Sequence, residues 1–163
     1  MINSRIQIEN GAIEDFYTKW GFIYKDADER TAPDEKKPDT TSYAEEAGEH
    51  QDSRRVLDAF DYKAEFFIDA PNQNLKSVNA KIEAFNAAIR QKQTGTDIAI
   101  AKEITFYNDN NHVKIVGYPE LIAVPTKAYY SPTLANYVDF AVVELKIRVT
   151  DPNKCNFDTV NNP

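Results

Sequence analysis

Residues 54–70, RRVLDAFDYKAEFFIDA, carry the strongest secondary-structure signal in the chain. Apolar and polar side chains alternate along much of this stretch, which is the period of a β-strand with one face in a core and the other in water. The apolar face, on which Asp58 is the exception, consists of Val56, Phe60, Tyr62, Ala64, Phe66 and Ile68. The pattern predicts a long, half-buried strand that ends at Pro71-Asn72.

A helix is predicted directly after this strand, over residues 75–92. Apolar residues recur there at alternating spacings of three and four, so they share one stripe of a helix. The stripe consists of Leu75, Val78, Ile82, Phe85 and Ile89. Asn72 or Asn74 can cap the start, and Gly95 follows the end, where glycine is favoured. A helix with one apolar stripe must pack on another element, and the surrounding strands offer that surface.

Further strands are expected at residues 2–9, 20–24, 103–107, 112–118, 121–130 and 137–149. Residues 103–107 and 112–118 flank an Asn-Asp-Asn-Asn turn and form a predicted hairpin. The apolar positions of the last strand change parity between Val142 and Val143, which indicates a β-bulge or a strand that serves two sheets. The expected fold is mostly β with one helix (α+β), an antiparallel β-sandwich or barrel-like structure with a single packed α-helix.

The chain is expected to form one β-sandwich domain over residues 1–157, with a long acidic loop at 26–52 and a frayed tail at 158–163. The loop contains ten Asp and Glu against three Lys and Arg, so it carries the whole formal net charge of −7. Loops longer than about 12–15 residues are uncommon in compact domains, and they are usually functional or disordered. The loop is therefore either a solvated, mobile insertion or a segment that orders against a partner subunit.

Composition argues against several classes of protein. An acidic chain without a basic stripe is a poor ligand for nucleic acid or for an anionic membrane, because both require clustered Lys and Arg. No apolar run is long enough to span a membrane, and the first ten residues contain no apolar run of signal-peptide length. Cys155 is the only cysteine and cannot form an internal disulfide. Synthesis in the cytoplasm is expected.

The search for catalytic, cofactor and metal sites is negative, so we expect no enzymatic activity and no cofactor. The two histidines, His50 and His112, are expected to be exposed polar residues, and no glycine-rich phosphate loop is present. The acidic pairs Asp34-Glu35 and Glu45-Glu46 could bind calcium, but they lack regular ligand spacing. Glu65 and Asp69 could form a glycosidase pair only if the fold placed them across a cleft.

Tyrosines gather late in the chain, and tyrosine is common at protein interfaces and on sugar-binding faces. The alternative is that they belong to the core and to a strand edge. Together with the acidic loop, they give the candidate interaction residues Tyr43, Glu45, Glu46, Tyr118, Tyr129, Tyr130 and Tyr137.

Five segments, taken in order, resemble a known family: DFYTKWGFIYKDAD, SRRVLDAFDYKAEFFIDA, LKSVNAKIEAFNAAI, ITFYNDNNHVKIVGYPE and VDFAVVELKIRVTDPNKCNF. Most of residues 12–157 resemble the N-terminal domain of phage distal tail proteins, in the version found in prophages of Bacteroides-like bacteria. The positions that carry the resemblance are Trp20-Gly21-Phe22, Arg54-Arg55, Phe85, Tyr107-Asn108 and Gly117-Tyr118-Pro119. Many members carry a second, C-terminal domain, which this sequence does not include.

The resemblance implies a tail-tube-like β-sandwich that assembles into a sixfold ring between the tail tube and the baseplate of a virion. It implies a homo-oligomer whose other partners are tail and baseplate proteins. From its composition, no direct nucleic-acid or membrane partner is expected. It makes the acidic loop a candidate for contact between subunits or rings. The residues alone leave a second hypothesis open, a monomeric β-sandwich module that binds carbohydrate or peptide.

Overall fold

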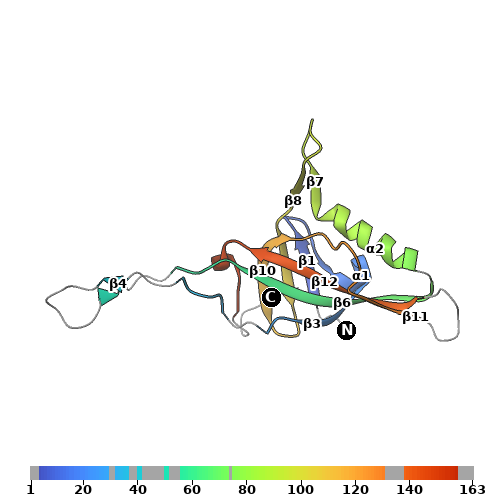
Figure 1. The fold of residues 1–163 in the computed structure, drawn as a ribbon, viewed down its shortest axis with the longest axis horizontal. Coiled ribbons are helices and arrows are strands. Elements are labelled where there is room, and N and C mark those ends of the chain that lie inside the picture. Colours follow the sequence, from blue (N-terminus) through green and yellow to red (C-terminus); the bar gives the residue numbers. More distant parts are fainter. Residues whose placement is uncertain are drawn as a thin grey trace.

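The centre of the fold is a pair of long antiparallel strands, β6 (Phe60–Gln73) and β12 (Val138–Val149). The computed structural model describes residues 4–29, 32–36, 40–41, 50–51, 56–73, 75–130 and 138–157. The two strands lie side by side along the length of the body (Figure 1), and their register runs from Phe60 opposite Val149 to Gln73 opposite Val138. The predicted alternation of β6 is confirmed, because Phe60, Tyr62, Ala64, Phe66 and Ile68 are all buried.

These two strands belong to an eight-stranded antiparallel sheet in the order β2-β1-β9-β10-β12-β6-β3, with β11 also paired to β12. The other members are β1 (Ser4–Ile8), β2 (Ile13–Asp15), β3 (Phe22–Ala27), β9 (Ile104–Asn108), β10 (Val113–Pro119) and β11 (Lys127–Tyr130). The predicted hairpin is confirmed as β9 and β10. The fold is mostly β with one long helix, as expected.

Strand β10 changes its pairing partner partway along its length, and this change divides the sheet into two halves that pack on each other. Residues Val113–Gly117 of β10 pair with β9, whereas Tyr118 and Pro119 pair with β12. A side chain at Gly117 would clash with the Arg148 carbonyl oxygen and lie 2.8 Å from Cγ2 of Ile147. Glycine at this position therefore permits the close crossing of β10 over β12.

The core fills the space between the two halves of the sheet. Phe106 of β9 lies 6.1 Å from Tyr62 and 6.0 Å from Phe66 of β6, measured between ring centroids. Phe16 stacks on Phe66 at 4.6 Å. Aromatic rings from both halves are thus in contact, which is the arrangement of a sandwich.

Two helices close one side of this core. The predicted long helix is confirmed as α2 (Leu75–Ala88), and Val78, Ile82 and Phe85 bury its apolar stripe. A short helix, α1 (Phe16–Trp20), packs beside it, with the Phe16 and Phe85 ring centroids 5.4 Å apart. Asp15 caps the start of α1, and Gly21 ends it in the left-handed conformation at φ 75°. A 3₁₀ helix, η1 (Pro152–Lys154), follows β12.

The predicted start of the acidic loop is wrong, because Asp26 and Ala27 belong to β3 and pair with β6. Residues 32–36, 40–41, 50–51 and 56–59 instead carry the pairings of a narrow ribbon. Glu35 bridges to Leu57 in antiparallel fashion, with hydrogen bonds from Lys36 N to Val56 O and from Asp58 N to Asp34 O, both 2.7 Å. Further out, β4 (Thr40–Thr41) pairs with β5 (His50–Gln51). We call residues 32–36, 40–41, 50–51 and 56–59 the acidic arm. Figure 1 shows β4 far from the body, at the end away from α2.

Several predicted boundaries are wrong. The strand expected at 20–24 begins at Phe22, because Trp20 ends a helix. β6 starts at Phe60, which leaves Val56 exposed on the arm, and continues through Pro71 to Gln73. It can continue because its register with β12 is irregular between Val138 and Phe140, a stretch where a proline without an N–H is tolerated.

Two further expectations fail around α2. The helix stops at Ala88 rather than at residue 92, because β7 (Arg90–Lys92) pairs with β8 (Ala99–Ala101) in a hairpin that projects from the body (Figure 1). Gly95 serves the turn of this hairpin, at φ 78°, instead of capping the helix. Of the predicted strand at 121–130, only β11 is extended and paired.

Candidate interaction surfaces

The outer face of β6 and β12, opposite the core, carries an aromatic cluster at one end. Tyr129 of β11 stacks on Phe140 of β12, with ring centroids 4.2 Å apart and planes 20° apart. Phe67 of β6 meets the edge of Phe140 at 5.5 Å, and Ile23 of β3 is the strand partner of Phe67. Tyr129 is 37% exposed and Ile23 is 36% exposed. We call Ile23, Phe67, Tyr129 and Phe140 the outer aromatic cluster.

This cluster explains the parity change seen in the sequence of β12. Val142 points to the outer face, yet it is only 5% exposed, while Val143 points into the core and is fully buried. Thr126 N donates to the carbonyl oxygen of Val142, and β11 pairs alongside. The strand therefore has apolar surroundings on both faces over this stretch. A bulge at the parity change is therefore wrong, because the register with β6 is unbroken from Ala141 to Val149; the one irregularity lies at the start of the strand, between Val138 and Phe140.

The opposite end of the outer face is charged. Asp61 of β6 accepts from Arg148 at 3.3 Å and lies 3.6 Å from the ammonium nitrogen of Lys146. Lys146 also lies 3.7 Å from Glu120. These side chains are half-exposed or exposed, so the pairs add little to the free energy of unfolding. This end of the face presents alternating charge rather than an apolar surface.

The predicted tyrosine patch is divided between these two ends. Tyr129 is the strand partner of Phe140, whereas Tyr118 is the partner of Arg148, eight positions further along β12. Eight residues of strand span roughly 26 Å, so the two rings do not form one patch. Tyr130 lies on β11 opposite Val138. Tyr43, Glu45, Glu46 and Tyr137 lie outside the described residues. An interaction role for all seven residues stays a prediction.

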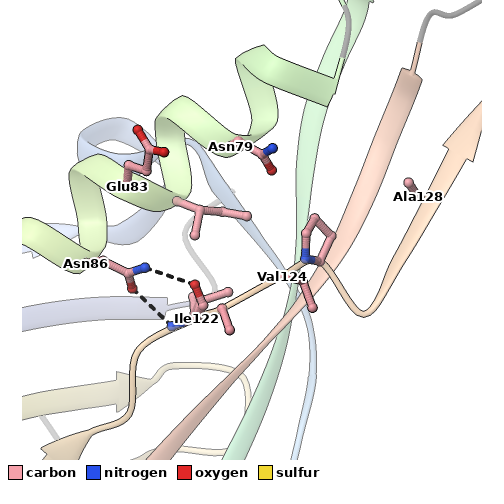
Figure 2. Close-up of a pocket in the computed structure, with 9 residues that line it drawn as sticks. Asn79, Glu83, Asn86, Ile122, Val124 and Ala128 are labelled. Carbon is pink, nitrogen blue, oxygen red and sulfur yellow. Dashed lines mark hydrogen bonds between the residues drawn. The ribbon is translucent and has the colours of Figure 1, made fainter.

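A groove between α2 and the segment before β11 was not predicted from the sequence (Figure 2). Its volume is about 400 Å³, and it is lined by Asn79, Glu83 and Val124 among others. Asn86 holds the wall in place, because its side chain donates to Ile122 O at 2.9 Å and accepts from Ile122 N at 3.0 Å. The missed signal is Asn86 itself, a polar residue beside the apolar stripe of the helix.

Buried polar groups join the two halves of the sheet, but they do not form a reactive site. Asn108 is fully buried, and its side-chain nitrogen donates to the hydroxyl oxygens of Tyr62 at 3.2 Å and Tyr24 at 3.3 Å. Burial raises the pKa of Tyr62 to about 12 and also raises the pKa of Tyr24. Both phenols are therefore neutral at physiological pH, which suits a structural role.

The structure also shows where the residues considered as catalytic or metal-binding candidates lie. Burial raises the pKa of Cys155, so its thiol is less reactive than a free cysteine. Glu65 and Asp69 lie on one strand, with their Cα atoms roughly 13 Å apart, which does not fit a glycosidase pair. Within the described ranges, no group of three His, Cys, Asp or Glu could hold a metal ion, and no helix there could cross a membrane.

The arrangement of strands and helices resembles a solved phage protein. The structure is similar to the crystal structure of the Dit protein of phage SPP1, with a TM-score of 0.50 and 17% sequence identity. The likeness covers 91% of this chain and 50% of the Dit chain. The chain shares its fold with a phage distal tail protein. Dit is described as a paradigm of the hub adsorption apparatus in phages that infect Gram-positive bacteria.

The Dit likeness confirms the resemblance to phage distal tail proteins at the level of the fold. The chain spans about half the length of Dit, and at this identity the likeness extends to the fold alone. An origin in a Bacteroides-type prophage stays a prediction. No protein-family model and no curated protein sequence matches the chain.

Proposed function

We propose that this chain is a structural subunit of a phage or prophage tail, of the distal tail type, which assembles into a ring at the junction of tail tube and baseplate. The observation that carries the proposal is the Dit fold, which extends over 91% of the chain. In this role the protein is not an enzyme. Its partners are copies of itself and other tail and baseplate proteins, and it resides in the virion.

The surfaces of the protein support an assembly role. A cyclic ring needs two different surfaces on each subunit, because the contact repeats head to tail. The outer aromatic cluster leaves Tyr129 and Ile23 partly exposed, and exposed aromatic side chains are typical of protein interfaces. The acidic arm leaves the body as a narrow ribbon, which makes it a second surface of different shape.

Charge also suits this location. A ring at the end of a tail surrounds the path of the genome, and an acidic protein does not retain DNA on its surface. The formal net charge of −7 is consistent with a role in which the protein does not bind nucleic acid.

The test is the mass of the purified protein by light scattering coupled to size exclusion, over a range of concentrations, with negative-stain imaging of any large species. We expect a mass near six protomers and particles with a central hole. The same measurement is repeated with tail tube and baseplate proteins encoded beside this chain. A monomer under both conditions would contradict the proposal.

One observation favours an alternative function, a monomeric module that binds carbohydrate or peptide. The ring of Tyr129 is partly exposed and is preorganised by stacking on Phe140, which is how aromatic side chains support a sugar ring. This alternative predicts a monomer that loses glycan or peptide binding in a Tyr129→Ala variant. Neighbouring genes for polysaccharide use, rather than tail genes, would favour it.

A further inference from the structure

The hairpin of β7 and β8 projects from the body and exposes the outer edge of β8 (Figure 1). Among the described strands, β8 pairs with β7 alone. Next to and within β8, Ile98 is 59% exposed and Ile100 is 48% exposed. An isolated two-stranded hairpin is at best marginally stable in water, so a further strand beside β8 would stabilise it.

The main-chain groups at this edge are set by the register of β8 with β7. Gln93 N donates to Ile98 O at 2.9 Å, and the next pair along the hairpin is Lys92 with Ala99. In an antiparallel pair of strands, residue pairs that exchange hydrogen bonds alternate with pairs that do not. Ala99, and Ala101 two positions further, therefore turn their N–H and C=O groups away from β7 and toward the open edge.

The edge of β8 differs from the edges of the main sheet because it carries no charge. The edge strands β2, β3 and β11 each contain at least one charged residue. β7 contains Arg90 and Lys92, and charged side chains on an edge oppose the addition of another strand. β8 consists of Ala99, Ile100 and Ala101. Its edge therefore accepts another uncharged, apolar strand.

A second copy of β8 has the chemistry that this edge accepts. Antiparallel pairing centred on Ala99 places that residue opposite its own counterpart, and Ile98 opposite Ile100 of the other copy. The two copies of Ala99 then exchange both of their main-chain hydrogen bonds. Asp97 lies opposite Ala101, so no like charges face each other directly. The edge is therefore complementary to itself.

We propose that β8 of one copy pairs with β8 of a second copy about a two-fold axis, so that two hairpins form one four-stranded antiparallel sheet. The two bodies lie at opposite ends of this sheet, because the paired strands run in opposite directions and each hairpin projects from its own body. Only residues 97–101 of each copy take part, so the contact is smaller than a standard interface and association depends on concentration.

This contact goes beyond the proposed ring and does not depend on it. A two-fold contact uses the same surface on both copies, whereas a cyclic ring uses two different surfaces on each subunit. A variant that blocks the β8 edge is therefore expected to abolish pairing without dissolving the ring.

The experiment is sedimentation equilibrium of the full-length chain over a range of concentrations. Ala99→Pro removes the N–H that points to the open edge, but it removes no hydrogen bond between β7 and β8. It is expected to weaken pairing at least about tenfold, because both N–H groups of the central pair are lost. Ala99→Val keeps the N–H and is the matched control, which is expected to pair as the wild type does.

A cysteine at position 99 tests the register. In the proposed pair the two Cα atoms of residue 99 lie about 5.5 Å apart, within the range of a disulfide. Ala99→Cys is expected to form a disulfide-linked dimer in a glutathione redox buffer at least about tenfold faster than Thr94→Cys, which lies at the exposed turn of the same hairpin. The wild type, with Cys155 alone, gives the background rate.

The outcomes separate the β8 contact from the proposed function. A wild type that does not pair at any concentration, or a folded Ala99→Pro variant that pairs equally well, would overturn the β8 contact. Equal disulfide rates for Ala99→Cys and Thr94→Cys would also overturn it. A ring that disappears in folded Ala99→Pro would assign this edge to the ring and overturn the two-fold contact. If the wild type pairs through β8 but forms no ring, the β8 contact stands and the ring does not. Circular dichroism and thermal unfolding establish that each variant is folded.

Discussion

The two faces of β6 carry adjacent phenylalanines in opposite surroundings. Phe66 points inward, is fully buried and contacts Phe16 and Phe106. Phe67 points outward, is half-buried and meets Phe140 in the outer aromatic cluster. The inner face is shared by both halves of the sheet, whereas the outer face is covered by its own side chains alone. The inner face therefore holds the fold, and the outer face can change without unfolding the protein.

The largest expected effect tests this difference directly. Phe66→Ala is expected to lower the free energy of unfolding by about 3–5 kcal/mol, because it leaves a cavity in the core. Phe67→Ala, on the next residue, is expected to cost about 1 kcal/mol, because water can fill the space. Chemical denaturation of both variants measures the difference. Equal losses would show that the outer face is as much a part of the core as the inner one.

The second prediction concerns pH and the buried hydroxyl of the inner face. The pKa of Tyr62 is about 12 in the folded state, above its ordinary value of 10.0. Between these values the unfolded state loses the proton while the folded state keeps it, so stability falls as pH rises. The loss reaches about 3 kcal/mol near the folded-state pKa, and Tyr62 makes no such contribution below pH 10.

Tyr62→Phe removes this titration. Its free energy of unfolding is expected to be lower than that of the wild type at neutral pH, because Asn108 loses an acceptor. The difference in unfolding free energy between the wild type and Tyr62→Phe is expected to narrow as pH rises above 10. Chemical denaturation at each pH measures it. A gap that stays constant to pH 12 would show that Tyr62 titrates normally in the fold.

The third prediction tests the crossing that separates the two halves of the sheet. Gly117→Ala is expected to cost about 1–3 kcal/mol, because the added methyl group meets the main chain of Arg148 and forces β10 away from β12. Gly95→Ala is the matched control, since nothing lies within 4 Å of the added group and only the positive φ opposes it. The control is expected to cost about 1 kcal/mol. Thermal unfolding compares them.

The fourth prediction separates stability from assembly on the outer face. Tyr129→Ala removes a stacked ring and is expected to cost about 1 kcal/mol of unfolding free energy. If the outer aromatic cluster lies at a subunit contact, the same change reduces the ring mass measured by light scattering. Loss of stability without any change in assembly would restrict the cluster to a packing role.

The smallest effect is expected at the charged end of the same face. Asp61→Asn removes the negative charge that pairs with Lys146 and Arg148, yet it is expected to change the free energy of unfolding by less than about 1 kcal/mol. The difference in unfolding free energy between the wild type and this variant is expected to be smaller still in high salt, because salt screens exposed ion pairs. A larger loss of unfolding free energy that does not depend on salt would mean that these ion pairs are shielded from solvent.

Local sequence patterns correctly predicted those helices and strands whose pattern of buried and exposed residues follows the ordinary helix or strand period. The alternation in β6 identified its buried face, the stripe in α2 identified Val78, Ile82 and Phe85, and the polar turn identified the β9–β10 hairpin. Each signal arises from residues within one element. The boundaries failed where a partner decided them, as at Pro71, which lies in β6 because of an irregular register with β12.

The candidate surfaces were less predictable, because they join distant parts of the sequence. The tyrosines were recognised as possible contact residues, but their spacing in the chain did not reveal that Tyr118 and Tyr129 lie at opposite ends of one face. The charge of the arm was plain from the sequence, but its pairing as a ribbon was not. The open edge of β8 requires a hairpin after Ala88, where the helix was expected to continue to residue 92.

The sequence by itself determined a mostly β chain with one amphipathic helix, an acidic segment and a face of alternating apolar residues. Those properties follow from side-chain chemistry and from the periods of helix and strand, which act over a few residues. Only the tertiary structure decided which strands became neighbours, where β10 crosses β12 and which groove formed beside α2. Contacts of that kind depend on shape complementarity between residues far apart in the chain, and the local periodicity of the sequence carries no information about that complementarity.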